Sequence, residues 1–182
     1  MSEKLFVVLL GCKPENRNVE QHDVFFGVAK TIKDLIPHMQ AFWPEAENGL
    51  HIDAYMPLEH ISGYDISVVN SESSEIGERL GLFCINLGGY APPEFEEYHK
   101  KLFVVVPTLS DAIAQAKTDP FYHDGVTVPR NPARSHVDDK IDVDEIINIQ
   151  NKLAGHRIVI RKATSARVVE PPRIGYLVFS KL

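Results

Sequence analysis

The apolar stretch Leu5-Phe-Val-Val-Leu-Leu-Gly11 returns later in the chain as Leu82-Phe-Cys-Ile-Asn-Leu-Gly88. When residue n is aligned with residue n + 77 from position 5 to position 43, 11 of the 39 pairs are identical. Unrelated segments of average composition would share about two or three. We infer a tandem duplication, and two copies predict a pseudo-symmetric pair of units rather than a solenoid. The identical pairs are Leu5/Leu82, Phe6/Phe83, Leu10/Leu87, Gly11/Gly88, Glu20/Glu97, His22/His99, Phe26/Phe103, Val28/Val105, Thr31/Thr108, Asp34/Asp111 and Ile36/Ile113.

Periodicity within the first copy predicts a ββαββ unit. Short continuous apolar runs are typical of buried strands. Thr31 followed by Asp34 predicts a helix start, because the hydroxyl can accept from a free backbone N–H and the acid favours the positive helix end. Pro37 is expected to kink or shorten that helix. The predicted strands of the first copy are residues 5–11, 24–29, 50–56 and 64–69.

The second copy is expected to differ near its end. Ile146, Ile149 and Leu153 have helical spacing and Gly155 is a typical helix stop, which together predict a helix before the last strand. Two further strands, near Val168 and over 174–180, extend the chain beyond the repeat. The expected fold class is α+β, with two pseudo-symmetric α/β sandwich halves and a C-terminal β extension. The predicted segments are 1–70 for the first unit, 71–80 for the linker, 81–165 for the second unit and 166–182 for the extension.

Composition excludes several classes of protein. The 182 residues are 44% hydrophobic and 24% charged, as in ordinary globular chains. No apolar run approaches the ~20 residues that a membrane-spanning helix needs. The run before Cys12 resembles a lipoprotein signal, but its recurrence deep in the chain favours a buried strand. Two cysteines cannot form a disulfide framework, so we expect a soluble cytoplasmic protein with no membrane partner.

The net charge of −6 is unevenly distributed. Residues 151–182 hold seven basic residues and one acid, so this segment carries +6 and the rest of the chain −12. A basic segment can bind nucleic-acid phosphates. However, no nucleic-acid motif accompanies it, and Arg157-Ile-Val-Ile-Arg161 alternates like a strand with a solvated face. We therefore expect no nucleic-acid partner. Exposed strand edges can pair with a second copy of the chain, so a homo-oligomer is expected.

Histidines and acids recur at matching positions of the two copies. Residues i and i+2 of a strand point to the same face, so each His-x-Asp can address one spot. Two imidazoles and a carboxylate are a common ligand set for zinc or non-haem iron. The first copy also offers Glu20 and the second Glu97. The predicted metal ligands are His22, His51 and Asp53 in the first copy, and His99, His136 and Asp138 in the second.

The same residues allow other interpretations. Each acid could simply accept a hydrogen bond from an imidazole or backbone N–H and pin a turn to a strand. Two facing His-x-Asp strands are also similar to the two-histidine phosphoesterases, whose histidines act as general base and acid. There Asp53 and Asp138 replace a hydroxyl residue, and their charge would repel a phosphate. The leading expectation is a non-catalytic binding or structural protein, and the alternative is a metal-dependent hydrolase with pseudo-equivalent sites. No catalytic residue is assigned.

Three motifs together resemble a small bacterial family. They are Leu-Phe…Leu-Gly-Gly, the Glu-x-His before the second strand, and the His-x-Asp that follows. The family is the domain of unknown function 1543, whose members carry one or two copies. The resemblance covers residues 5–53 and 82–144, and the first copy departs from it at Cys12, where the second has Gly89. It implies duplication, bacterial origin and a cytoplasmic location, and it implies no reaction.

Overall fold

The N-terminal apolar run forms the central strand of a sheet. In the computed structural model, β1 (Lys4–Cys12) is buried along most of its length. It pairs antiparallel with β2 (Gln21–Ala29) on one side and with β3 (His51–Pro57) on the other. β13 (Arg173–Val178) adds to the outer edge of β3, giving the order β13-β3-β1-β2. A strand with neighbours on both edges satisfies its backbone groups without water and can therefore be continuously apolar.

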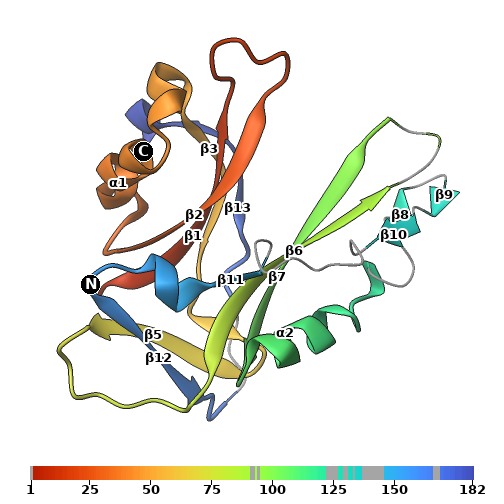
Figure 1. Cartoon of the computed structure of the whole chain (residues 1–182). Coiled ribbons are helices and arrows are strands. Elements are labelled where there is room, and N and C mark those ends of the chain that lie inside the picture. The colour runs from red at the N-terminus through yellow and green to blue at the C-terminus, as the bar shows by residue number, and fades with distance from the viewer. Residues whose placement is uncertain are drawn as a thin grey trace. The chain divides into compact units, whose positions relative to one another are not determined.

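The structure describes residues 2–90, 93, 95–121, 127–128, 131–132, 134–136, 146–165 and 169–182. The chain forms two compact units (Figure 1). Unit 1 consists of Met1–Gly77 together with Lys152–Leu182, and unit 2 consists of Glu78–Asn151. The first unit is therefore built from both ends of the chain, and the second from its middle.

Short helices pack on the four-stranded sheet of unit 1. η1 (Ile32–Leu35), α1 (Ile36–Phe42) and η2 (Pro44–Gly49) follow β2. The predicted start occurs, since the Asp34 carboxylate accepts from the Thr31 N–H at 2.9 Å and from its hydroxyl at 2.8 Å. Pro37 lies in the first turn of α1, where its missing N–H costs nothing. Figure 1 shows α1 beside the sheet, where its buried residues join the core. That core contains Phe6, Val8, Leu10, Cys12, Phe25, Ala29, Leu35, Met39, Ala46, Leu50 and Ile52.

A second sheet of unit 1 joins strands that are distant in sequence. β5 (Tyr64–Asn70) pairs with β4 (His60–Ile61) on one edge and with β12 (His156–Lys162) on the other. The sequence placed residues 156–162 in the second unit, whereas β12 pairs with β5 along seven residues. The reason is apolar burial, because Ile66 of β5 and Val159 and Ile160 of β12 are all buried.

The basic side chains of β12 hold the predicted linker. The Arg157 guanidinium donates to the carbonyl oxygens of Ser73 at 2.8 Å and Glu75 at 2.5 Å. Arg161 pairs with the Glu75 carboxylate at 2.7 Å. These contacts commit two of the basic residues of the C-terminal segment to the chain itself.

In unit 2, the recurring apolar run again forms the central strand. β6 (Gly81–Tyr90) pairs antiparallel with β7 (Glu97–Val106) along its whole length. Its other ladders are formed by β10 (Arg134–His136) and β11 (Ile146–Asn148). α2 (Leu109–Ala116) contacts both β6 and β7, and the Thr108 hydroxyl accepts from the Asp111 N–H at 3.2 Å, as predicted. A short ribbon of β8 (Thr127–Val128) and β9 (Asn131–Pro132) completes the described strands.

The predicted helix over residues 146–153 is wrong. Residues 146–148 form β11, and a 3-10 turn, η4 (Ile149–Lys152), follows it. Two consecutive β-branched isoleucines fit a pleated strand well, and β6 offers them an edge to pair with. Asn148 then begins the turn, because its side-chain oxygen accepts from the Gln150 N–H at 3.1 Å. The expected strand near Val168 lies outside the described residues. The strand expected at 174–180 is β13, followed by η5 (Phe179–Lys181).

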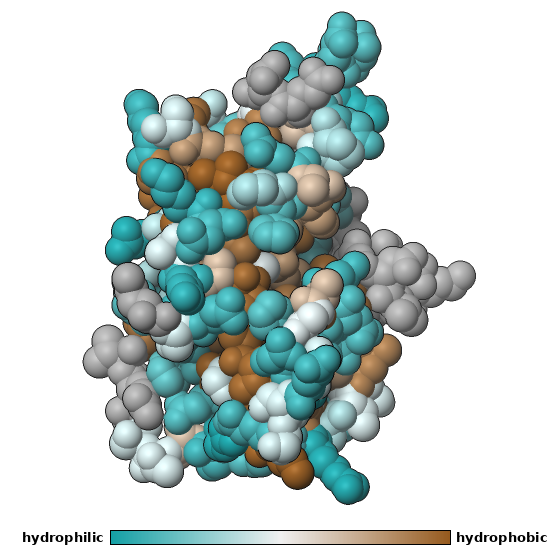
Figure 2. Space-filling view, turned by 90° about the vertical axis from the view of Figure 1, so that its left-hand side faces the viewer, coloured by the Kyte–Doolittle hydropathy of each residue, from teal (hydrophilic) through white to brown (hydrophobic). Residues whose placement is uncertain are grey.

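The fold is therefore a mixture of α and β structure with mostly strands and few helices. On the face shown in Figure 2, hydrophilic side chains interrupt the apolar ones. No helix in the described part of the chain is long and apolar enough to span a membrane.

Replacing Arg157 should loosen the linker without disturbing the sheets. Arg157→Ala removes the donor to two carbonyl oxygens, so we expect a loss of about 1 kcal/mol in the free energy of unfolding. We also expect faster proteolytic cleavage within residues 71–77, measured by limited digestion and mass spectrometry. Lys162→Ala is the matched control, because it removes another basic side chain of β12, whose ammonium lies over the Tyr64 ring. Equal cleavage of the two variants would contradict this role.

Candidate functional site

Two of the predicted site residues flank one glycine. Gly11, near the end of β1, pairs with His22 on β2 and with His51 on β3. Directly paired residues of an antiparallel sheet point to the same face. The sheet thus brings together two histidines that are far apart in sequence, on either side of a residue without a side chain.

Gly11 forms the floor of the site. A Cβ at this position would lie 2.5 Å from Nε2 of His51, and closer still to Oδ2 of Asp53. Real atoms do not approach so closely, so any side chain here would displace both groups. The glycine is required by this close approach and not by backbone conformation.

Asp53 is singled out by the irregularities of both neighbouring ladders. Leu9 and Leu10 of β1 are consecutive, yet they pair with Ala54 and Ile52 of β3. On the other edge of β3, the ladder with β13 also shifts register between Ile52 and Ala54. Both ladders therefore skip Asp53. Such bulges re-aim side chains and are frequent next to functional sites.

The side chains of Glu20, His22, His51 and Asp53 converge, and we call them the His–carboxylate cluster. Nε2 of His22 lies 3.1 Å from Oδ2 of Asp53 and 3.9 Å from Oε2 of Glu20. Nε2 of His51 lies 2.8 Å from Oε1 of Glu20 and 3.4 Å from Oδ1 of Asp53. His51 is 3% exposed, whereas Glu20 and His22 are 44% and 45% exposed. The cluster thus has one buried side and one side open to solvent.

The hydrogen bond of His51 to Gly49 determines which ring nitrogen of His51 can accept a proton or bind a cation. Nδ1 lies 2.9 Å from the carbonyl oxygen of Gly49, which can only accept, so Nδ1 carries a proton. In the neutral ring, Nε2 then presents a lone pair. Nε2 of His51 and Oδ2 of Asp53 are both buried without a hydrogen-bond partner. The short contact with Glu20 is therefore a close approach without hydrogen-bond alignment. Electron pairs face one another here unless a proton or another cation lies between them.

The cluster brings imidazole and carboxylate groups close together but is not a finished coordination shell. Within the described residues, no three His, Cys, Asp or Glu side chains are arranged to hold one metal ion. The two exposed members, Glu20 and His22, lie where β2 begins and have solvent in which to turn. The buried His51 is held by its bond to Gly49.

Unit 2 repeats the backbone register of the cluster. Gly88 of β6 pairs with His99 on β7 and with His136 on β10, as Gly11 pairs with its two histidines. Nε2 of His99 lies 3.9 Å from Oε2 of Glu97, the same separation as between His22 and Glu20. Asp138 and the side chain of His136 lie outside the described residues.

The two cysteines contribute no reactive thiol. Burial raises the pKa of Cys12, and the nearby Glu20 carboxylate raises it further. Burial raises the pKa of Cys84 to about 11. A thiol with a raised pKa stays protonated at neutral pH and is a poor nucleophile. The two cysteines also stand at non-equivalent positions of the two copies, which argues against a shared thiol role.

Tyr176 lies beside the cluster, although the sequence does not predict it as a site residue. Its ring centroid lies 4.2 Å from that of His51, at an interplanar angle of 39°. Residues 174–180 were predicted only as a strand, since nothing local shows which strand would receive it. The sequence signal of an irregularity there is a glycine inside the expected strand, Gly175, which adopts φ +145° in the structure.

These observations define a mixed, mostly β fold with a histidine and carboxylate cluster at one end of its central strand. The model of the Domain of Unknown Function (DUF1543) family matches residues 17–68, which contain all four residues of the cluster. A crystal structure of a protein Il1583 from Idiomarina loihiensis is similar, with a TM-score of 0.61 and 22% identity over 97% of each chain. At that identity the likeness concerns the fold alone. No curated protein matches the chain.

Adding one methyl group at Gly11 should disrupt the cluster. We expect Gly11→Ala to displace His51 and Asp53 and to lower the free energy of unfolding by about 1–3 kcal/mol, as overpacking does. Thermal and denaturant unfolding would measure the loss. Gly49→Ala is the matched control, because a Cβ there would lie at an ordinary 3.4 Å from Sγ of Cys12. Equal stability of the two variants would show that the close approach at Gly11 is relieved cheaply.

Proposed function

We propose that unit 1 is a non-catalytic binding module for a divalent transition-metal ion. The ligands would be His22, His51 and Asp53, with Glu20 as a fourth group beside them. The observation that carries the proposal is the buried Nε2 of His51, which faces two carboxylates without a hydrogen bond. A bound cation would remove the repulsion between these electron pairs.

The environment of His51 supports a metal ligand. A ligating histidine usually donates its other ring N–H to a carbonyl or carboxylate, which fixes its tautomer and orientation. His51 makes that bond to Gly49 through Nδ1. Imidazole and carboxylate together suit zinc, iron and manganese.

The spacing of the donor atoms also supports the proposal. Ligand bonds of ~2.0–2.1 Å in a tetrahedral zinc site place neighbouring donor atoms about 3.3 Å apart. The separations in the cluster range from 2.8 Å to 3.9 Å. We propose that the exposed Glu20 and His22 side chains rotate to bring the donors around one ion.

We propose binding rather than hydrolysis because the acidic and basic side chains of the cluster already contact one another. Glu20 contacts both histidines, and Asp53 does the same. With Glu20 as a fourth ligand, all four side chains would hold the ion and none would be left to act as a general acid or base.

Metal titration tests the proposal directly. Protein purified without a histidine tag and treated with a chelator should bind zinc, measured by calorimetry and by elemental analysis after dialysis. At a free metal concentration 100 times the Kd, one site adds about 2.7 kcal/mol to the free energy of unfolding. His51→Ala should abolish that gain in unit 1.

His60→Ala is the matched control for the metal titration. Nδ1 of His60 pairs with Asp65 at 2.7 Å, so this variant removes a histidine–carboxylate pair outside the cluster. It should leave metal binding unchanged. A wild-type protein whose unfolding temperature ignores zinc, iron(II) and manganese would refute the proposed function.

We also propose that the chain descends from a tandem duplication, with the strands of the second copy divided between the two units, and that unit 2 retains a second cluster. The equivalent registers of Gly11 and Gly88 support this. So does the pairing of β5 with β12, which is centred on Ser67 and Val159. These two residues are equivalent when 61–66 is aligned with 153–158, as expected of strands related by a local two-fold axis.

A second site predicts a stoichiometry. The wild-type protein should bind two zinc ions, and His22→Ala and His99→Ala should each retain one, counted by elemental analysis. The two single variants are controls for each other. A wild-type stoichiometry of one that His99→Ala leaves unchanged would contradict a second site and leave the first intact.

A further inference from the structure

Tyr176 covers the buried histidine of the His–carboxylate cluster. Its ring lies against the His51 imidazole, with centroids 4.2 Å apart. His51 is 3% exposed although Tyr176 itself is 67% exposed. The tyrosine ring therefore covers one histidine, while most of the tyrosine itself stays exposed to solvent.

The backbone of β13 is shaped for this contact. Ile174 pairs with Ala54 and Leu177 pairs with Ile52, so two residues of β13, Gly175 and Tyr176, face the single residue Asp53. Gly175 has φ +145°, a conformation that side chains disfavour. The bulge thus depends on a glycine, and it places the aromatic residue next to His51 and Asp53.

The ring of Tyr176, and not its hydroxyl, makes the contact. Within the described residues, Tyr176 contacts His51 through its aromatic ring. Since the hydroxyl has no role in it, phenylalanine should replace tyrosine here at little cost.

We propose that Tyr176 is a positioning residue of the metal site. Its ring and the hydrogen bond to Gly49 restrain the His51 imidazole from two directions, so that Nε2 is aimed at the carboxylates before an ion arrives. The same ring covers His51, so the ion enters and leaves past the exposed Glu20 and His22. This inference rests on the proposed function.

Cobalt(II) titration tests the role of Tyr176, because the visible absorption of the bound ion reports its coordination geometry. Outer-shell partners of ligating histidines are worth 10–100-fold in metal affinity. We expect Tyr176→Ala to weaken cobalt binding by about tenfold and to change the absorption spectrum. Tyr176→Phe should bind within about twofold of the wild type, with the same spectrum.

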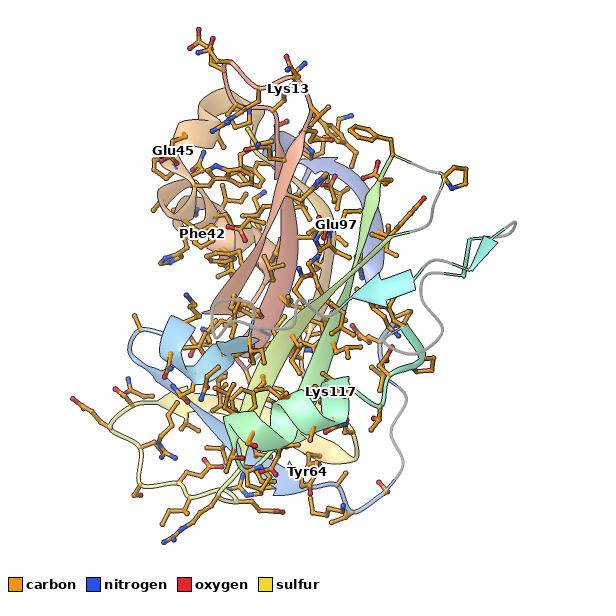
Figure 3. All side chains as sticks on the ribbon, turned by 45° about the vertical axis from the view of Figure 1, so that its right-hand side comes forward. Lys13, Phe42, Glu45, Tyr64, Glu97 and Lys117 are labelled. Carbon is orange, nitrogen blue, oxygen red and sulfur yellow. The ribbon has the colours of Figure 1, made fainter. Side chains whose placement is uncertain are left out.

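Two further variants complete the design. Tyr64→Ala is the control, because it removes a half-buried aromatic ring from β5, in the other sheet of unit 1 (Figure 3). Gly175→Ala keeps the tyrosine but disfavours the bulge, so it should weaken cobalt binding as Tyr176→Ala does. It also provides the test should Tyr176→Ala fail to fold.

The outcomes separate this inference from the proposed function. Wild-type protein that binds no cobalt and no zinc refutes both. Wild-type binding that Tyr176→Ala and Gly175→Ala leave unchanged in affinity and spectrum refutes the positioning role alone. Equal weakening by Tyr176→Phe and Tyr176→Ala would also overturn it, because the effect would then belong to the hydroxyl.

Discussion

The double pairing of β1 is the constraint on which the site depends. A strand that is paired on both edges and buried must be apolar almost throughout, and the run from Leu5 to Leu10 satisfies this. Its last residues, Gly11 and Cys12, carry no large side chain. The ladder therefore leaves a gap above Gly11, and the ladder partners His22 and His51 close over that gap. The same register that builds the sheet assembles the cluster.

The cluster sits at a local break in the regularity of the sheet. Asp53 is skipped by the ladders on both edges of β3, while its neighbour Ile52 packs into the core. Natural sheets carry such irregularities where function needs a side chain to be re-aimed. Two unsatisfied buried polar atoms at the same place are unusual in a native structure and call for a partner.

The amino-acid sequence predicts much of this arrangement, and what it misses has physical causes. The strands, both capped helix starts and the approach of His51 to Asp53 follow from local patterns. His22 joins them because of the register between β1 and β2, which cannot be predicted from a local sequence pattern. The strand pairing of β12 with β5 and of β13 with β3 is likewise invisible locally, because any apolar strand can fill either edge. The helical spacing of Ile146 and Ile149 led to a wrong helix prediction, because residues 146–148 instead pair as β11 with an edge of β6.

The two-part composition of unit 1 has a consequence for how the protein is made. Its second sheet needs β12 and its first sheet needs β13, so neither sheet is complete until residues 156–178 have been translated. Unit 2 is continuous in sequence and is available earlier. Domains fold as they emerge during synthesis. Unit 2 is thus able to fold before unit 1, while β3 and β5 each keep one unpaired edge until β13 and β12 have been translated.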